Sequence, residues 1–284
     1  MFAALLSVSL PFLLCVVLVN TGLFDSVLVD LDPSHYAEKR VHALPAFLAM
    51  PCNCLVNVGY ICVGLYWLLW NRLGTEPDRS RYMRQVFALM ALVYAPVQWT
   101  RLTVLRLAPA VLDQWLTLPI FAWVRVWIRY IEEPPGRWSG AHGAAHGAAL
   151  ELCSLLSYGL TLLHARGFEA ALGAHVALAV HAAVRLQLKY GDRRTRTVLL
   201  LAVLSFAGFV VLKLLDHQLA RYRLFQRLTG HFWSKVCDVL QFHLSFRFLT
   251  ALDQRVQQNR AKAAGLTEPV QGCWTNRTGL KLQD

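Results

Sequence analysis

The sequence predicts an all-α integral membrane protein, a bundle of about seven to eight transmembrane helices. Of the 284 residues, 56% are apolar and only 16% are charged, whereas soluble domains are about a quarter charged. Mostly apolar stretches of about 20 residues recur along the chain. This is the length that an α-helix needs to cross the hydrocarbon core of a bilayer.

Eight candidate spans follow one another along the chain. They are Ala4–Leu23, Leu44–Trp70, Val86–Leu107, Ala110–Tyr130, Ala145–His164, Ala170–Lys189, Thr197–Leu215 and Gly230–Thr250. The first span lacks the basic start and small-residue cleavage site of a signal peptide, so we expect a retained helix rather than a cleaved one. Only a short turn separates the fifth span from the sixth, and we expect a helical hairpin rather than one re-entrant element.

The chain is predicted to divide into two parts. Residues 1–251 form the multi-pass bundle, and residues 252–284 form a polar, flexible cytosolic tail, because apolar spans end there and termini are commonly poorly ordered. The tail contains Asn276-Arg277-Thr278, a formal glycosylation acceptor. A cytosolic tail predicts that Asn276 is not glycosylated.

The net charge is +11, and the positions of the basic residues indicate which side of the membrane each loop faces. Lys and Arg lie mainly in the loops, and the side that holds both termini carries about twice as many as the other side, which predicts that both termini are cytosolic. Basic loops next to a membrane also attract anionic lipid head groups. The partner that this charge pattern predicts is therefore the lipid bilayer, and no nucleic acid is expected.

The last span carries ionisable groups that hydrocarbon tolerates poorly, and such groups usually face the interior of a bundle. At about 100° per residue, His231, Lys235 and Asp238 fall on one stripe, whereas His243 falls on a different face. The spacing of Lys235 and Asp238 predicts an ion pair. An ion or ligand pathway and a catalytic metal site are the alternatives.

Further polar groups lie in or beside the spans. Lys213, Asp216 and His217 end the seventh span and are assigned to the same buried network, with Asp216 and His217 at the rim of a polar pocket in one interpretation. Asp113 with Arg125 or with Lys213 is an example of a pair that these groups could form, and one sequence does not choose the partners. Glu151 also lies in a candidate span. Such groups either pair for packing or line a relay for protons or ions.

Several segments resemble the vertebrate transmembrane protein 187 family over most of the chain, from Gly22 to about Thr250. They are VLKLLDHQLA (211–220), RLFQ (223–226), LTGHFWSKVCDVLQFH (228–243), LPAFLAMP (44–51), YAPVQW (94–99) and VLDQWLTLPIFAW (111–123). The resemblance implies a multi-pass protein without a settled activity. It also implies an endomembrane location, in the Golgi apparatus or endoplasmic reticulum, rather than the plasma membrane.

A remoter likeness concerns chemistry. The order of features is similar to that of the seven-helix superfamily of alkaline ceramidases and adiponectin-receptor-like proteins, in which His and Asp residues hold a zinc ion within the membrane. By that likeness, Gln98 takes the place of the first His, Asp113 that of the Asp, and His243 that of the final His. The sequence departs from the pattern, because Gln98 is a poor zinc ligand and Val239 stands where the paired His is required.

These observations favour a non-enzymatic bundle that interacts with lipids or proteins, with no cofactor and a lipid as the candidate ligand. The first alternative is a divergent zinc-dependent intramembrane hydrolase of a lipid amide or ester, with Asp113 and His243 as catalytic candidates and Gln98, Asp113 and His243 as metal candidates. The second alternative is an ion or small-molecule transporter. No two related halves with interrupted helices are visible to support transport.

Overall fold

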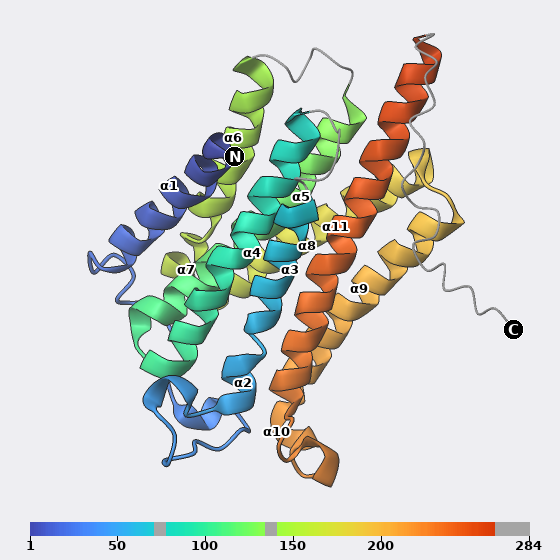
Figure 1. Ribbon diagram of the computed structural model, residues 1–284. Helices are drawn as coiled ribbons and strands as arrows, with labels where there is room; N and C mark the ends of the chain where they lie inside the picture. Colours follow the sequence, from blue (N-terminus) through green and yellow to red (C-terminus); the bar gives the residue numbers. More distant parts are fainter. Residues whose placement is uncertain (71–77, 134–140, 265–284) are drawn as a thin grey trace, which may run out of the picture.

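The computed structural model describes residues 1–70, 78–133 and 141–264, and within them every regular element is helical (Figure 1). The elements are α1 (Phe2–Val19), η1 (Pro33–His35), η2 (Ala46–Leu48), α2 (Pro51–Leu55), α3 (Val58–Trp70), α4 (Asp78–Val104), α5 (Leu107–Glu132), α6 (Ala141–Ser157), α7 (Leu160–Leu163), α8 (Gly167–Tyr190), α9 (Arg193–Leu214), α10 (Asp216–Leu219), η3 (Arg223–Phe225) and α11 (Gly230–Ala263). The predicted all-α fold is confirmed.

Six segments of the described chain are long and apolar enough to cross a membrane: α1, α2 with α3, α5, α6 with α7, α8 and α9. Two other helices, α4 with 27 residues and α11 with 34 residues, are about 40 and 51 Å long at 1.5 Å per residue. Both helices are more polar in composition than the other six segments. Many of their polar side chains are buried in the interior of the bundle, where such groups are tolerated. The predicted seven to eight crossings thus correspond to six apolar helices and two polar ones.

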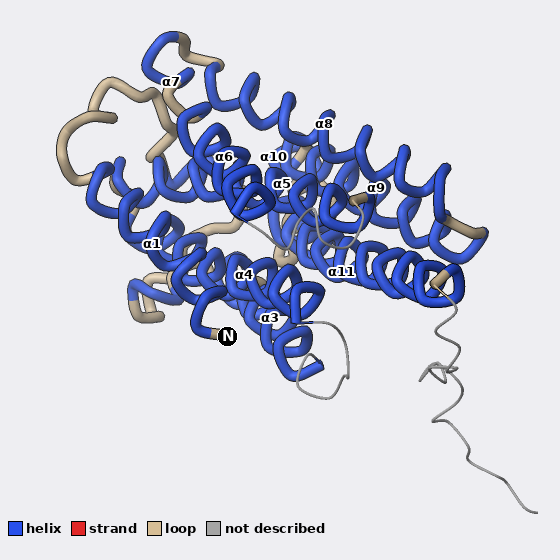
Figure 2. Tube along the Cα trace, turned by 90° about the horizontal axis from the view of Figure 1, so that it is seen from above, coloured by secondary structure: helices blue, strands red, loops and turns tan. Residues whose placement is uncertain are grey.

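Helix α5 lies in the middle of the bundle and packs against α1, α4, α6, α8 and α11 (Figure 2). Of its most apolar 18-residue window, 67% is buried, whereas the value for α9 at the periphery is 11%. The core is aromatic: the Trp67 and Phe246 rings stack with centroids 4.9 Å apart, and Phe87 lies 4.5 Å from Phe246. These rings join α3, α4 and α11.

Three predicted boundaries are corrected. The second span begins at Pro51 rather than Leu44, because the residues before it form the turn η2. Helix α4 begins at Asp78, eight residues before the predicted span. The bundle does not end at residue 251, since α11 continues to Ala263.

The continuation of α11 has a physical cause. Its last turns are rich in Gln, Arg, Lys and Ala, which are strong helix formers. Leu252 and Val256 share one face at a spacing of four residues and are buried, as is Asp253. Residues 252–263 therefore belong to the bundle, and Asn276 lies outside the described residues.

The expected hairpin between the fifth and sixth spans is present as two separate elements, α7 and α8, joined by a turn at residues 164–166. The backbones approach closely there: a Cβ at Gly167 would lie 2.1 Å from the carbonyl oxygen of Leu160. Only glycine fits at this position. The turn therefore depends on one residue without a side chain.

The turn between α8 and α9 is fixed by Asp192. Its side chain accepts from the backbone N–H of Thr195 at 2.8 Å, and the Thr195 hydroxyl accepts from the backbone N–H of Asp192 at 2.9 Å, which makes a capping box. Arg255 of α11 donates to the Asp192 carboxylate at 2.5 Å and to the carbonyl of Tyr190 at 3.2 Å. The Asp192–Arg255 pair thus joins α8, α9 and α11.

Asp192→Ala is expected to lower the free energy of unfolding by about 1 kcal/mol, the usual cost of losing an N-cap. The hydrogen bond from the Thr195 backbone N–H, together with Arg255, lowers the pKa of Asp192 to about 2. Because the folded pKa is below the unfolded value of about 3.9, this stabilisation is present above pH 4 and lost as the pH falls toward 2. Thermal unfolding in detergent measures both effects. Asp25→Ala, at an exposed carboxylate, is the control. An equal loss of unfolding free energy in this control would contradict the role of Asp192.

Candidate functional site: a buried polar cluster

Polar side chains gather inside the bundle near one end, at the bottom of Figure 1, where α4 passes into α5 and α10 into α11. The buried members are Gln98, Asp113, Asp216, His231, Ser234, Lys235 and Asp238, each less than 9% exposed. They come from four elements, α4, α5, α10 and α11. Buried polar groups of this kind require partners.

Asp113 has partners on both carboxylate oxygens. The side-chain amide of Gln98 donates to one oxygen, and the guanidinium of Arg101 donates to the other and forms an ion pair. The Asp113 backbone carbonyl accepts from the Thr117 hydroxyl at 2.9 Å. The ion-pair partner of Asp113 is therefore Arg101 rather than either example, Arg125 or Lys213, because α4 continues to Val104 and places Arg101 beside the start of α5.

Asp238 and Lys235 do not form the predicted direct ion pair. Asp238 accepts a hydrogen bond of 2.5 Å from the Tyr60 hydroxyl of α3. The Lys235 ammonium lies 5.8 Å from the ring centroid of Tyr94 and 5.5 Å from that of Phe209, and these are cation–π distances. Aromatic faces therefore surround the lysine, although Asp113 and Asp238 still act on it electrostatically.

The structure places His243 with a different set of neighbours. Its ring centroid lies 5.9 Å from Tyr66 and 5.8 Å from Trp67, whereas His231 packs 4.9 Å from Tyr36. The structure thus joins Gln98 directly to Asp113 and places His243 among aromatic rings. In the described part of the chain, no group of three or more His, Cys, Asp or Glu side chains is arranged to hold a metal ion.

Asp216 connects the loop after α1 to the start of α11. One carboxylate oxygen accepts from the backbone N–H of Ala37 at 2.9 Å, and the other accepts from the backbone N–H of His231 at 2.7 Å. Asp216 is 3% exposed, whereas His217 is exposed and its Nε2 lies 3.2 Å from the carbonyl oxygen of His35. Asp216 is therefore an internal structural partner rather than a rim residue.

Glu38 accepts hydrogen bonds from backbone N–H groups at the start of the second span, as Asp216 does at the start of α11. Its two carboxylate oxygens accept from the backbone N–H groups of Cys52 and Asn53, each at 2.8 Å, in the first turn of α2. A carboxylate is well placed at a helix N-terminus. Burial nevertheless raises the pKa of Glu38 above its usual value, against the lowering effect of these two hydrogen bonds. Residues 36–38 thereby cover the end of the polar cluster.

Sequence reasoning did not find Arg101, Tyr60 or Glu38 as members of this arrangement. Tyr60 and Asp238 are 178 residues apart, and a tyrosine in an apolar span gives no signal of its partner. Arg101 lies 12 residues before Asp113. The short connection between two long helices is the feature that brings these two together.

The geometry defines a class: a multi-pass helical membrane protein whose buried charges are mostly held by hydrogen bonds, ion pairs and aromatic faces. Residues 4–250 match the model of the TMEM187 protein family, and the chain belongs to that family. It is 57% identical to "Transmembrane protein 187" of Homo sapiens over 84% of this chain and 87% of the relative. It is 52% identical to "Transmembrane protein 187" of Bos taurus over 88% of this chain and 96% of the relative. No solved structure matches it.

Asp216→Asn is expected to lower the free energy of unfolding by about 1–3 kcal/mol, because the amide retains one acceptor where the carboxylate serves two backbone N–H groups. Limited proteolysis of the 36–50 segment should also become faster, since Ala37 loses its anchor. Glu169→Gln, at an exposed carboxylate, is the matched control. Unchanged stability and proteolysis in Asp216→Asn would show that this link is dispensable.

Proposed function

We propose that this member of the TMEM187 family is a non-enzymatic membrane protein that binds a lipid, with an acyl chain in a groove between α8 and α9. The observation that supports the proposal is an apolar cavity among α5, α8, α9 and α11, with about 530 Å³ of empty space including its open side. Apolar side chains form most of its lining, as is usual in ligand sites.

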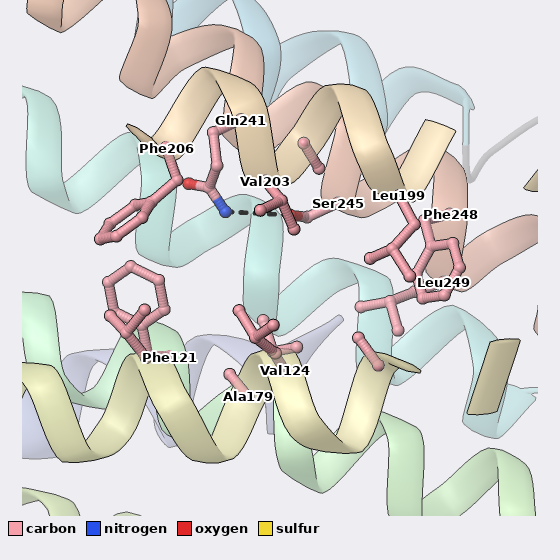
Figure 3. Close-up of a pocket in the computed structure, with 14 residues that line it drawn as sticks. Phe121, Val124, Ala179, Leu199, Val203, Phe206, Gln241, Ser245, Phe248 and Leu249 are labelled. Carbon is pink, nitrogen blue, oxygen red and sulfur yellow. Dashed lines mark hydrogen bonds between the residues drawn. The ribbon is translucent and has the colours of Figure 1, made fainter. Parts of the chain in front are cut away.

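The walls of the groove come from two pairs of helices (Figure 3). Phe121, Val124 and Ala179 lie on one wall, and Val203 and Phe206 of α9 lie on the opposite wall. The polar pair in the lining is Gln241 and Ser245 of α11, and Gln241 donates to the Ser245 hydroxyl at 3.0 Å. Because these two polar groups bond to each other and the rest of the lining is apolar, the groove offers a surface that suits a hydrocarbon chain.

The position of the groove supports a lipid rather than a water-soluble ligand. Helices α8 and α9 lie at the periphery of the bundle, and only 22% and 11% of their apolar windows are buried. The Asp192 turn joins these two helices at one end only. Because the groove lies between two outward-facing helices, a lipid chain enters it directly from the hydrocarbon core of the bilayer.

Two lysines of the interior lie where the head group of such a lipid would be. Lys213 and Lys235 both lie near the ring of Phe209, at 5.8 and 5.5 Å from its centroid. Phe209 is three residues beyond Phe206 on α9, about one helical turn. A lipid whose chain fills the groove would therefore direct its polar end toward two cations, Lys213 at the end of α9 and Lys235 near the start of α11.

The hydrolase alternative has no comparable support. A hydrolytic zinc site requires about three protein ligands and an open position for water. Both oxygens of Asp113 are engaged by Gln98 and Arg101, and His243 packs against Tyr66 and Trp67. We therefore propose neither a resident zinc ion nor a hydrolytic reaction.

Orientation and location are part of the proposal. The start of α1 and the end of α11 lie toward the same end of the bundle (Figure 1), where Arg193, Arg194 and Arg196 also lie. By the positive-inside rule we propose that this end is cytosolic, in a Golgi or endoplasmic reticulum membrane. An electrophoretic shift of the cell-expressed protein that Asn276→Gln abolishes would contradict this orientation.

Ala179→Phe is expected to reduce the amount of lipid that co-purifies with the protein by at least about fivefold, because the new ring occupies the groove where Ala179 is 5% exposed. Native mass spectrometry of the purified full chain measures lipid retained per molecule. Ala177→Phe, on the exposed side of α8, is the matched control and should retain lipid. Equal retention by both variants would contradict the proposed groove.

A further inference from the structure

A second cavity lies on another side of the molecule, among α1, α4, α5 and α6. It has about 430 Å³ of empty space including its open side, and its walls are mainly apolar, with Phe12, Met90, Ile120 and Leu155 among them. Glu151 of α6 also lines it. A carboxyl group in such surroundings requires a partner.

The described residues supply no such partner for one of the Glu151 oxygens. Its Oε1 is covered from solvent and has no hydrogen-bond partner. Among the described residues, no Lys, Arg or His side chain forms an ion pair with Glu151, whereas Asp113 pairs with Arg101 and Asp192 pairs with Arg255. Glu151 is thus a carboxyl group that lines a cavity with one free acceptor.

Ser7 and Tyr94 carry the side-chain hydroxyl groups in the lining. Pro11 and Pro119 line the cavity, and a proline within a helix leaves the carbonyl four residues earlier without its usual N–H donor. For Pro11 this carbonyl belongs to Ser7, which also lines the cavity. The Ser7 hydroxyl is already engaged, with the carbonyl of Ala3 at 2.9 Å and the Tyr82 hydroxyl at 2.8 Å. A molecule that complements the covered Glu151 oxygen must bring a hydrogen-bond donor.

We infer that this cavity binds a long-chain amine, with its ammonium group on Glu151 and its hydrocarbon chain against the apolar walls. An ammonium group donates three hydrogen bonds, and its positive charge compensates the negative charge of a buried carboxylate. An alcohol donates only one and leaves the carboxylate uncompensated. Helices α1 and α6 both line the cavity, and most of each faces outward, so an amphiphile enters from the bilayer.

The test uses the purified full chain in nanodiscs and a photoreactive probe, hexadecylamine with a diazirine in its chain. The probe should label peptides of α1 or α6, and unlabelled hexadecylamine should compete. Glu151→Gln should reduce labelling at least about tenfold, because the amide carries no charge. Glu169→Gln, at an exposed carboxylate of α8, should label like the unaltered protein.

A second variant separates loss of the ligand from loss of the fold. Val93→Phe fills the cavity from α4 and leaves Glu151 in place, and it should also reduce labelling while thermal unfolding remains cooperative. The inference is overturned if Glu151→Gln labels normally, if labelling maps elsewhere, or if hexadecanol with the same diazirine labels as strongly as the amine. Because the groove between α8 and α9 is a separate site, the Ala179→Phe result does not affect this inference.

Discussion

The ion pair between Arg101 and Asp113, with the Gln98 amide on the second carboxylate oxygen, is the interaction on which the arrangement of this bundle depends. It joins the end of α4 to the start of α5, the helix around which five others pack. Removing one partner from a buried pair leaves an uncompensated charge, which costs about 3–5 kcal/mol. Other buried carboxylates also need partners: Asp238 accepts a hydrogen bond from the Tyr60 hydroxyl, and Asp216 accepts from two backbone N–H groups.

Helix α11 links this polar interior to the proposed lipid groove. One end of its buried face carries His231, Lys235 and Asp238, and later turns carry Phe248 and Leu249 in the groove wall. The polar groups at one end and the apolar walls further along match the two ends of an amphiphile. A single helix thereby provides both the charged and the apolar parts of the proposed site.

Helical geometry predicted much of this from the sequence. The spacing of His231, Lys235 and Asp238 sets them on one side of a helix and sets His243 apart, and the structure has that separation. The partners could not be predicted in the same way, because Tyr60 and Ala37 lie far along the chain from Asp238 and Asp216. The length of α11 was also underestimated, since the apolar run ends near Thr250 whereas good helix formers continue the buried face to Val256.

A double-mutant cycle between Arg101 and Asp113 tests the central claim most directly. The free energy of unfolding is measured in mixed micelles for Arg101→Met, for Asp113→Asn and for the double variant. Each single substitution should cost about 3 kcal/mol or more, and the double variant should cost less than their sum by at least about 1 kcal/mol, because neither charge then remains alone. Single costs below about 1 kcal/mol that simply add would contradict the account.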